Sequence, residues 1–142
     1  MDKKKTQRQI VYEKALEYAE KHFTKIDVKF GKYDGSQRCQ HVSRQLIEER
    51  NADTVAVTLS FVPNSGVNVH FINRVNGEYV DNTLGYLSKK NFYYLISEHT
   101  LEELQKDDVN MSKMLMNQKE SILKKLFTED EKKNHDIGND HI

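Results

Sequence analysis

The chain has 142 residues, of which 37% are hydrophobic and 31% charged, and its formal net charge is zero. This length suits one domain with a real core. No apolar run approaches the ~18 residues of a membrane-spanning helix, and the balanced charge argues against a nucleic-acid partner. The basic start is not followed by an apolar stretch, so we expect no signal peptide. Cys39 is the only cysteine and suits a reducing, cytoplasmic location.

The first third of the chain predicts two helices joined by a short extended segment. Residues 6–23 carry apolar side chains at helical spacing on one face. Residues 26–30 alternate apolar and polar, as a half-buried strand does. Residues 37–50 form the second predicted helix, with Ser36 as its N-cap and Asp34 as the alternative.

The middle of the chain predicts a sheet. Four runs rich in β-branched and aromatic residues predict strands at 54–61, 67–73, 78–81 and 92–97. Between the second and third of these strands lies Asn76-Gly77. This pair is the strongest hairpin signal in the sequence, because both central positions of a type I′ turn need a positive φ.

The last part of the chain predicts helices. Thr100 and Glu103 form a capping box at the start of one helix, and residues 109–127 form a longer amphipathic helix that contains several methionines. We predict an α+β fold, in which an antiparallel sheet of about four strands packs against an N-terminal helix pair, with C-terminal helices. Residues 1–127 would form a single domain with its core in 25–107, and 128–142 a disordered tail.

The register of the predicted hairpin brings two candidate site residues, His70 and Asp81, together. With an Asn76-Gly77 turn, His70 lies diagonal to Asp81, and with a Val75-Asn76 turn it lies directly opposite. Both turns contain two residues, and side chains along a strand alternate with period two. His70 and Asp81 therefore share one face of the sheet for either turn, within reach of each other.

Cys39 is the third candidate. As the third residue of its predicted helix it meets backbone N–H groups and the positive end of the helix dipole, which favour a thiolate. A cysteine at a helix start, a strand histidine and a carboxylate on the next strand suit acyl transfer. Cys39 would attack a carbonyl, His70 would move the proton and Asp81 would orient the ring. Gln37 and Gln40 are candidate oxyanion donors.

Three segments carry a family resemblance: GSQRC at 35–39, VHF at 69–71 and GEYVDN at 77–82. They resemble the papain-like/transglutaminase-like superfamily, in particular the small papain-fold domains of bacterial toxins and related peptidases and amidases. The resemblance implies that Cys39, His70 and Asp81 are the nucleophile, base and orienting residue. It implies a cysteine peptidase, amidase, deamidase or transglutaminase that acts on a protein or peptide amide without a cofactor.

Simpler interpretations remain open. Cys39 could be a buried structural cysteine, since free cysteine is among the most buried residue types. A metal site at Cys39 and His41 lacks the ligand spacing of zinc sites. The alternative function is a non-catalytic binding protein of papain-like fold, such as a mobile-element accessory protein. Its C-terminal helix at 109–127 would form a homodimer or capture a partner.

Overall fold

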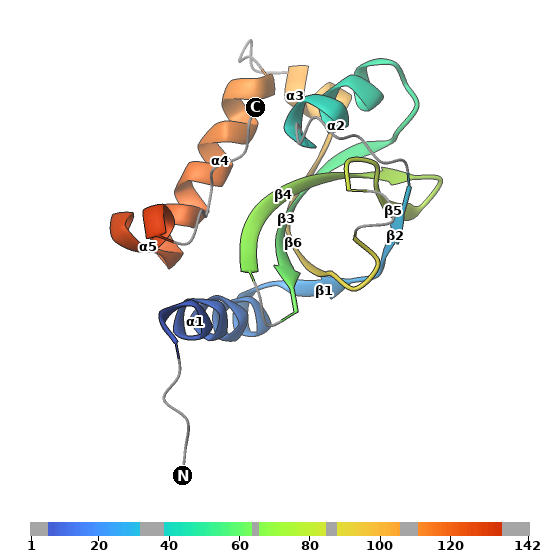
Figure 1. The fold of residues 1–142 in the computed structure, drawn as a ribbon. Coiled ribbons are helices and arrows are strands. Elements are labelled where there is room, and N and C mark those ends of the chain that lie inside the picture. The colour runs from blue at the N-terminus through green and yellow to red at the C-terminus, as the bar shows by residue number, and fades with distance from the viewer. Residues whose placement is uncertain (1–5, 32–38, 64–65, 85–87, 106–110, 135–142) are drawn as a thin grey trace.

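The computed structural model describes residues 6–31, 39–63, 66–84, 88–105 and 111–134 (Figure 1). The elements follow in the order α1 (Gln7–His22), β1 (Thr24–Ile26), β2 (Val28–Phe30), α2 (Cys39–Glu48), β3 (Thr54–Val62), β4 (Gly66–Val75), β5 (Glu78–Asp81), β6 (Phe92–Thr100), α3 (Leu101–Gln105), α4 (Met111–Leu126) and α5 (Glu129–Asn134).

The sheet has six strands in the order β1-β6-β3-β4-β5-β2. From β1 to β5 in this order, each strand is antiparallel to its neighbour, whereas β2 runs parallel to β5. The fold is α+β, but the predicted antiparallel sheet of about four strands packed on an N-terminal helix pair is wrong. The sequence pattern predicted one extended segment at 26–30, whereas the structure divides this stretch at Asp27 into β1 and β2. These two strands pair with β6 and β5, which lie far along the chain, so no local pattern indicated their partners.

The two edges of the sheet belong to one stretch of chain. β1 is the edge strand beside β6 and β2 is the edge strand beside β5, yet only Asp27 separates them. The sheet must therefore curl until its edges meet, as the path of β1 and β2 around it shows (Figure 1). A backbone bond from Gly31 N–H to the Asp81 carbonyl, 2.9 Å long, extends the β2–β5 pairing by one residue.

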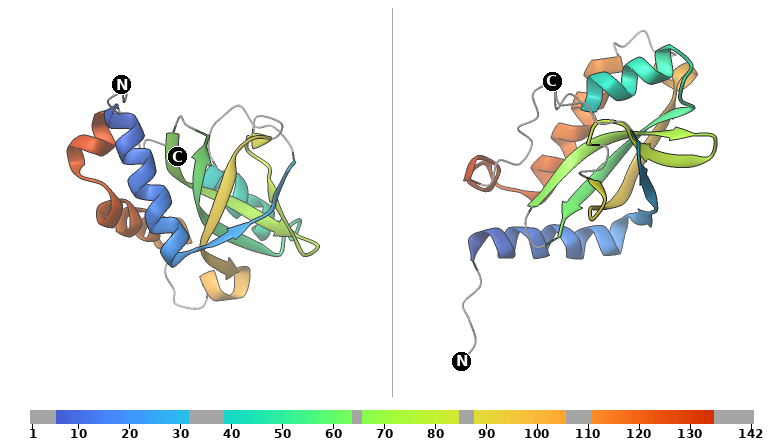
Figure 2. Two further views of the ribbon diagram at one scale, coloured as in Figure 1. Left: turned by 90° about the horizontal axis from the view of Figure 1, so that it is seen from below. Right: turned by 45° about the vertical axis from the view of Figure 1, so that its right-hand side comes forward.

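The curled sheet has a helix-covered outer face and an inner face. Figure 2 shows α1, α2 and α4 outside the curve of the strands. The main core lies between these helices and the outer face, and includes Ala15, Ile47, Val57, Phe71 and Leu115. A second, smaller cluster fills the inside of the curl and is built on Ala56, Ile72 and Tyr93.

An irregularity in β6 changes which side chains face inward. Leu95 pairs with Thr58 and Ser97 pairs with Val57, so one extra residue of β6 lies between adjacent positions of β3. Such a bulge shifts the alternation of side chains by one. Tyr93 therefore faces the inside of the curl, while Ser97 faces outward and bonds Gln118 of α4.

The predicted hairpin is confirmed. Val75 pairs with Glu78 across the turn, and the two turn residues both have positive φ, 51° at Asn76 and 83° at Gly77. These are the values of a type I′ turn. The Asn76-Gly77 turn is thus the correct choice of the two considered, and it sets the register of β4 and β5.

Side chains cap the starts of several helices, and Thr100 is a cap as predicted. Thr6 caps α1 in a reciprocal pair with Gln9, and the Thr100 hydroxyl accepts from the Glu103 N–H at the start of α3. The predicted tail begins with a helix, because Thr128 caps α5 and Glu131 of α5 bonds Lys14 of α1 at 2.8 Å. Residues 135–142 lie outside the described residues. Within the described part of the chain, no helix is both long and apolar enough to cross a membrane.

Replacing Gly31 by Ala should destabilise the fold by about 1–3 kcal/mol, because an added Cβ would lie 2.6 Å from Val80 Cγ1 and still closer to Asn82 Oδ1. Urea unfolding followed by circular dichroism measures the loss. Gly66→Ala is the matched control, since its Cβ would meet no atom within 4 Å, and it should unfold within about 0.5 kcal/mol of the wild type. Equal stability of the two variants would show that the close approach at Gly31 is not needed.

Candidate functional site

His70 of β4 and Asp81 of β5 are hydrogen-bonded inside the curl of the sheet. The His70 Nε2 and the Asp81 Oδ2 are 2.8 Å apart. The His70 residue is 9% exposed and Asp81 is fully buried. The prediction that these two side chains share a face is therefore confirmed, and they are in direct contact.

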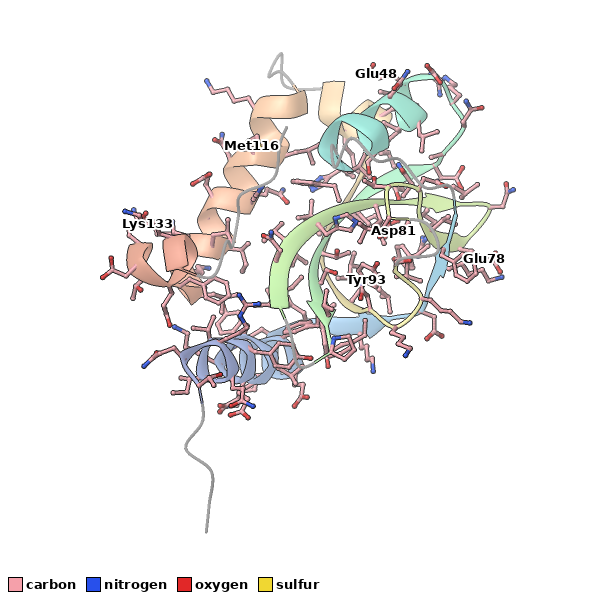
Figure 3. The ribbon with its side chains drawn as sticks, viewed as in Figure 1. Glu48, Glu78, Asp81, Tyr93, Met116 and Lys133 are labelled. Atoms are coloured by element: carbon pink, nitrogen blue, oxygen red, sulfur yellow. The ribbon has the colours of Figure 1, made fainter. Side chains whose placement is uncertain are left out.

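Asp81, labelled in Figure 3, accepts hydrogen bonds on both of its carboxylate oxygens. Oδ1 accepts from the backbone N–H groups of Thr83 and Leu84, at 3.0 and 2.9 Å. Oδ2 accepts from the Tyr93 hydroxyl at 2.7 Å, in addition to its bond with His70. A buried carboxylate needs such compensation, because burial without partners would drive it to the neutral form.

The balance of these effects keeps Asp81 ionised. Burial raises the pKa of Asp81, but the His70 charge and the hydrogen bonds from His70, Leu84 and Tyr93 lower it further, to about 2. With the carboxylate ionised, the proton of this pair resides on His70 Nε2, which donates to Asp81. The remaining ring nitrogen, Nδ1, is the one through which His70 could exchange a proton with a substrate or nucleophile.

Other buried polar side chains surround this pair. Thr58 pairs with His70 across β3 and β4, and its hydroxyl donates to the His70 carbonyl at 2.7 Å. Ser60, Thr83 and Ser88 are also buried, each 7% exposed or less. One end of the interior is therefore polar, and this concentration of buried polar groups marks it as the candidate site.

The structure places α2 on the other side of β4. The Ser43 hydroxyl donates to the Phe71 carbonyl at 3.0 Å, and Ile47 packs in the outer core with Phe71. Cys39 is the first residue of α2, rather than the third residue of a helix. Its side chain lies outside the described part of the structure, as do Gln37 and the side chain of Gln40.

Tyr93 is the site residue that the sequence analysis did not identify, since it was placed only within the predicted strand 92–97. It is 1% exposed and reaches Asp81 from β6. Its inward direction depends on the pairing of β6 with β3, which joins positions more than thirty residues apart. The Asp81 contacts to Thr83 and Leu84 had a local signal, because Asp side chains commonly accept from N–H groups two and three residues ahead.

The described residues contain no group of three or more His, Cys, Asp or Glu side chains that could hold a metal ion. No family model, curated protein or solved structure matches this chain.

Replacing Asp81 by Asn should lower the free energy of unfolding at neutral pH, and the loss should shrink in acid. Its folded pKa of about 2 lies below the ordinary value of 3.8. The ionised carboxylate therefore stabilises the fold above about pH 4, and this stabilisation disappears as the pH falls towards 2. The pH-dependent part is on the order of 2 kcal/mol. Urea unfolding of both proteins between neutral pH and about pH 2.5 measures it.

Asp27→Asn is the matched control, because it removes an exposed carboxylate. It should follow the pH dependence of the wild type. If the difference in the free energy of unfolding between the wild type and Asp81→Asn stays constant over this pH range, Asp81 does not carry a stabilising charge.

Proposed function

We propose that this chain is a cysteine-dependent acyl-transfer enzyme that acts on an amide of a protein or peptide. Cys39 is the nucleophile, His70 the general base and Asp81 the residue that orients His70. The observation that supports this most is the 2.8 Å bond between His70 and the buried, ionised Asp81. A histidine fixed by a buried carboxylate is the base component of such sites.

The chemistry assigns a task to each group. His70 Nδ1 takes the thiol proton as the Cys39 sulfur attacks the carbonyl carbon, and Asp81 stabilises the imidazolium that forms. The tetrahedral oxyanion collapses, the C–N bond breaks, and the leaving amine takes the proton from His70. Water or a second amine then releases the acyl group. Gln37 and Gln40 are the proposed oxyanion donors, and a cytoplasmic location would keep the Cys39 thiol reduced.

The position of α2 determines how far Cys39 must reach for this mechanism to work. Ser43 and Ile47 contact the outer side of β4, whereas His70 faces the inner side. The start of α2 must therefore bring the Cys39 sulfur around the sheet to within about 3–4 Å of the His70 ring. This distance decides between the enzyme and a protein in which the His70–Asp81 pair only stabilises the fold.

Thiol reactivity tests the proposal directly, because Cys39 is the single cysteine of the chain. Iodoacetamide at neutral pH should alkylate Cys39 in the native protein, and His70→Gln should slow the reaction by about tenfold or more through loss of the base. The rate is measured by mass spectrometry of the intact protein. His99→Gln, at a half-buried histidine that contacts Ser97 and Gln118, is the control and should react like the wild type.

A Cys39 thiol that reacts with iodoacetamide only after denaturation would contradict the enzyme proposal. The same conclusion would follow if His70→Gln and His99→Gln were alkylated at equal rates while both kept the native circular dichroism spectrum.

A non-catalytic binding protein is the second candidate, and the docking of α2 on the outer face favours it. The long C-terminal helix α4 was the expected partner surface. Its Leu115, Ile122 and Leu126 are buried in the outer core, so these residues serve the fold. Self-association would have to use side chains of α4 that the core leaves partly open, such as Met116, which is half-buried at the edge of the packed face (Figure 3).

Replacing Met116 by Lys tests self-association without removing the core of the protein. If α4 mediates a homodimer, sedimentation of the full chain should give a dimer mass at high micromolar concentration and Met116→Lys should give a monomer, because a charge at a packed interface is costly. Lys124→Glu, at an exposed position of the same helix, is the control. A monomeric wild-type chain would exclude this use of α4.

A further inference from the structure

Two donors share one oxygen of Asp81. His70 Nε2 and the Tyr93 hydroxyl both lie within 2.8 Å of Oδ2. The three side chains come from three strands, β4, β5 and β6, and converge inside the curl, where Asp81 and Tyr93 lie on the side of the sheet away from α4 (Figure 3). The rings of His70 and Tyr93 are 6.2 Å apart between centroids. The two donors therefore bind the same oxygen from different directions.

The Tyr93 hydroxyl stays protonated and so remains a donor. Burial raises the pKa of Tyr93 far above its ordinary value, and the charge of Asp81 raises it further. Hydrogen bonds with Ser88 and Asn91 act in the opposite direction without overcoming these effects. A hydroxyl that accepts hydrogen bonds while it donates one is polarised by them, which strengthens the bond it donates.

Oδ1 of Asp81 keeps its position and its hydrogen bonds when the donors to Oδ2 change. Two backbone N–H groups, those of Thr83 and Leu84, fix Oδ1. The carboxylate is thus held in place whether or not Tyr93 donates. Any electron density that Tyr93 does not draw from Oδ2 becomes available to His70.

We propose that Tyr93 is a positioning residue that sets the basicity of His70 through the oxygen of Asp81 that the two residues share. Its catalytic meaning rests on the proposed function, whereas its effect on His70 does not. By taking part of the charge of Oδ2, Tyr93 weakens the stabilisation that Asp81 gives to a protonated His70. His70 then returns its proton to a leaving group more readily than it would beside an unshared carboxylate.

Two ionisable side chains lie beside His70 among the described residues of the interior. Among the described side chains facing the interior beside it, the ionisable ones are Asp81 of β5 and Tyr93 of β6, while β3 contributes the neutral Thr58 and Ser60. A change in the titration of His70 that follows a change at Tyr93, and does not follow a matched change at Tyr94, is therefore assigned to the oxygen that His70 and Tyr93 share.

The test is the imidazole titration of His70, followed by NMR in the full chain. Tyr93→Phe removes the hydroxyl and keeps the ring, so the titration midpoint of His70 should move to higher pH by a few tenths of a unit. Tyr94→Phe is the matched control, because Tyr94 is a buried tyrosine next in sequence that packs on the outer face. It should leave the midpoint unchanged.

Ser88→Ala provides a milder second variant if Tyr93→Phe does not fold, because it removes one hydrogen bond to the Tyr93 hydroxyl. It should move the midpoint in the same direction by less. A midpoint unchanged in a folded Tyr93→Phe, or unchanged in Ser88→Ala where Tyr93→Phe does not fold, would overturn the positioning role. The same would follow if Tyr93→Phe and Tyr94→Phe moved it equally.

The rate of Cys39 alkylation against pH separates this inference from the proposed function. If the pH dependence of Cys39 alkylation in Tyr93→Phe moves together with the His70 titration, the positioning role of Tyr93 and the catalytic use of His70 are both supported. If the His70 titration moves and the Cys39 profile does not, the positioning role stands and the proposed catalytic use of His70 fails.

Discussion

One stretch of chain pairs with both edges of the same sheet, and the rest of the structure depends on this closure. β1 bonds β6, β2 bonds β5, and Asp27 alone joins them. A sheet tied at both edges by seven residues, Thr24 to Phe30, has to curl, and curling divides it into an outer face for helices and a small interior.

The interior created by this closure combines a small apolar cluster with a buried charge. Burying Asp81 costs free energy, and the structure offsets this with donors from three directions. His70 comes from β4, Tyr93 from β6, and the N–H groups of Thr83 and Leu84 from the turn after β5. The Tyr93 donor is the one that depends on the curl, because β3 and β4 separate β6 from β5 in the sheet order, so this bond and the curl stabilise each other.

The position of α2 connects the fold to the question of function. The helix lies on the outer face through Ser43 and Ile47, so the sheet itself separates its packed residues from His70. An acyl-transfer site needs its nucleophile and base on one side. The start of α2, at Cys39, is therefore the part of the molecule whose position determines whether the buried pair performs chemistry.

The sequence by itself determined what depends on neighbouring residues. The Asn76-Gly77 turn fixed the hairpin register, and strand alternation then placed His70 beside Asp81; Thr100 likewise marked a helix start. Only the tertiary structure decided the parallel pairing of β2, the bulge that turns Tyr93 inward, and the face that α2 covers. Turns and caps are set by bonds within a few residues. Pairing between distant strands and the choice of a sheet face depend on how the whole chain packs, which no local pattern records.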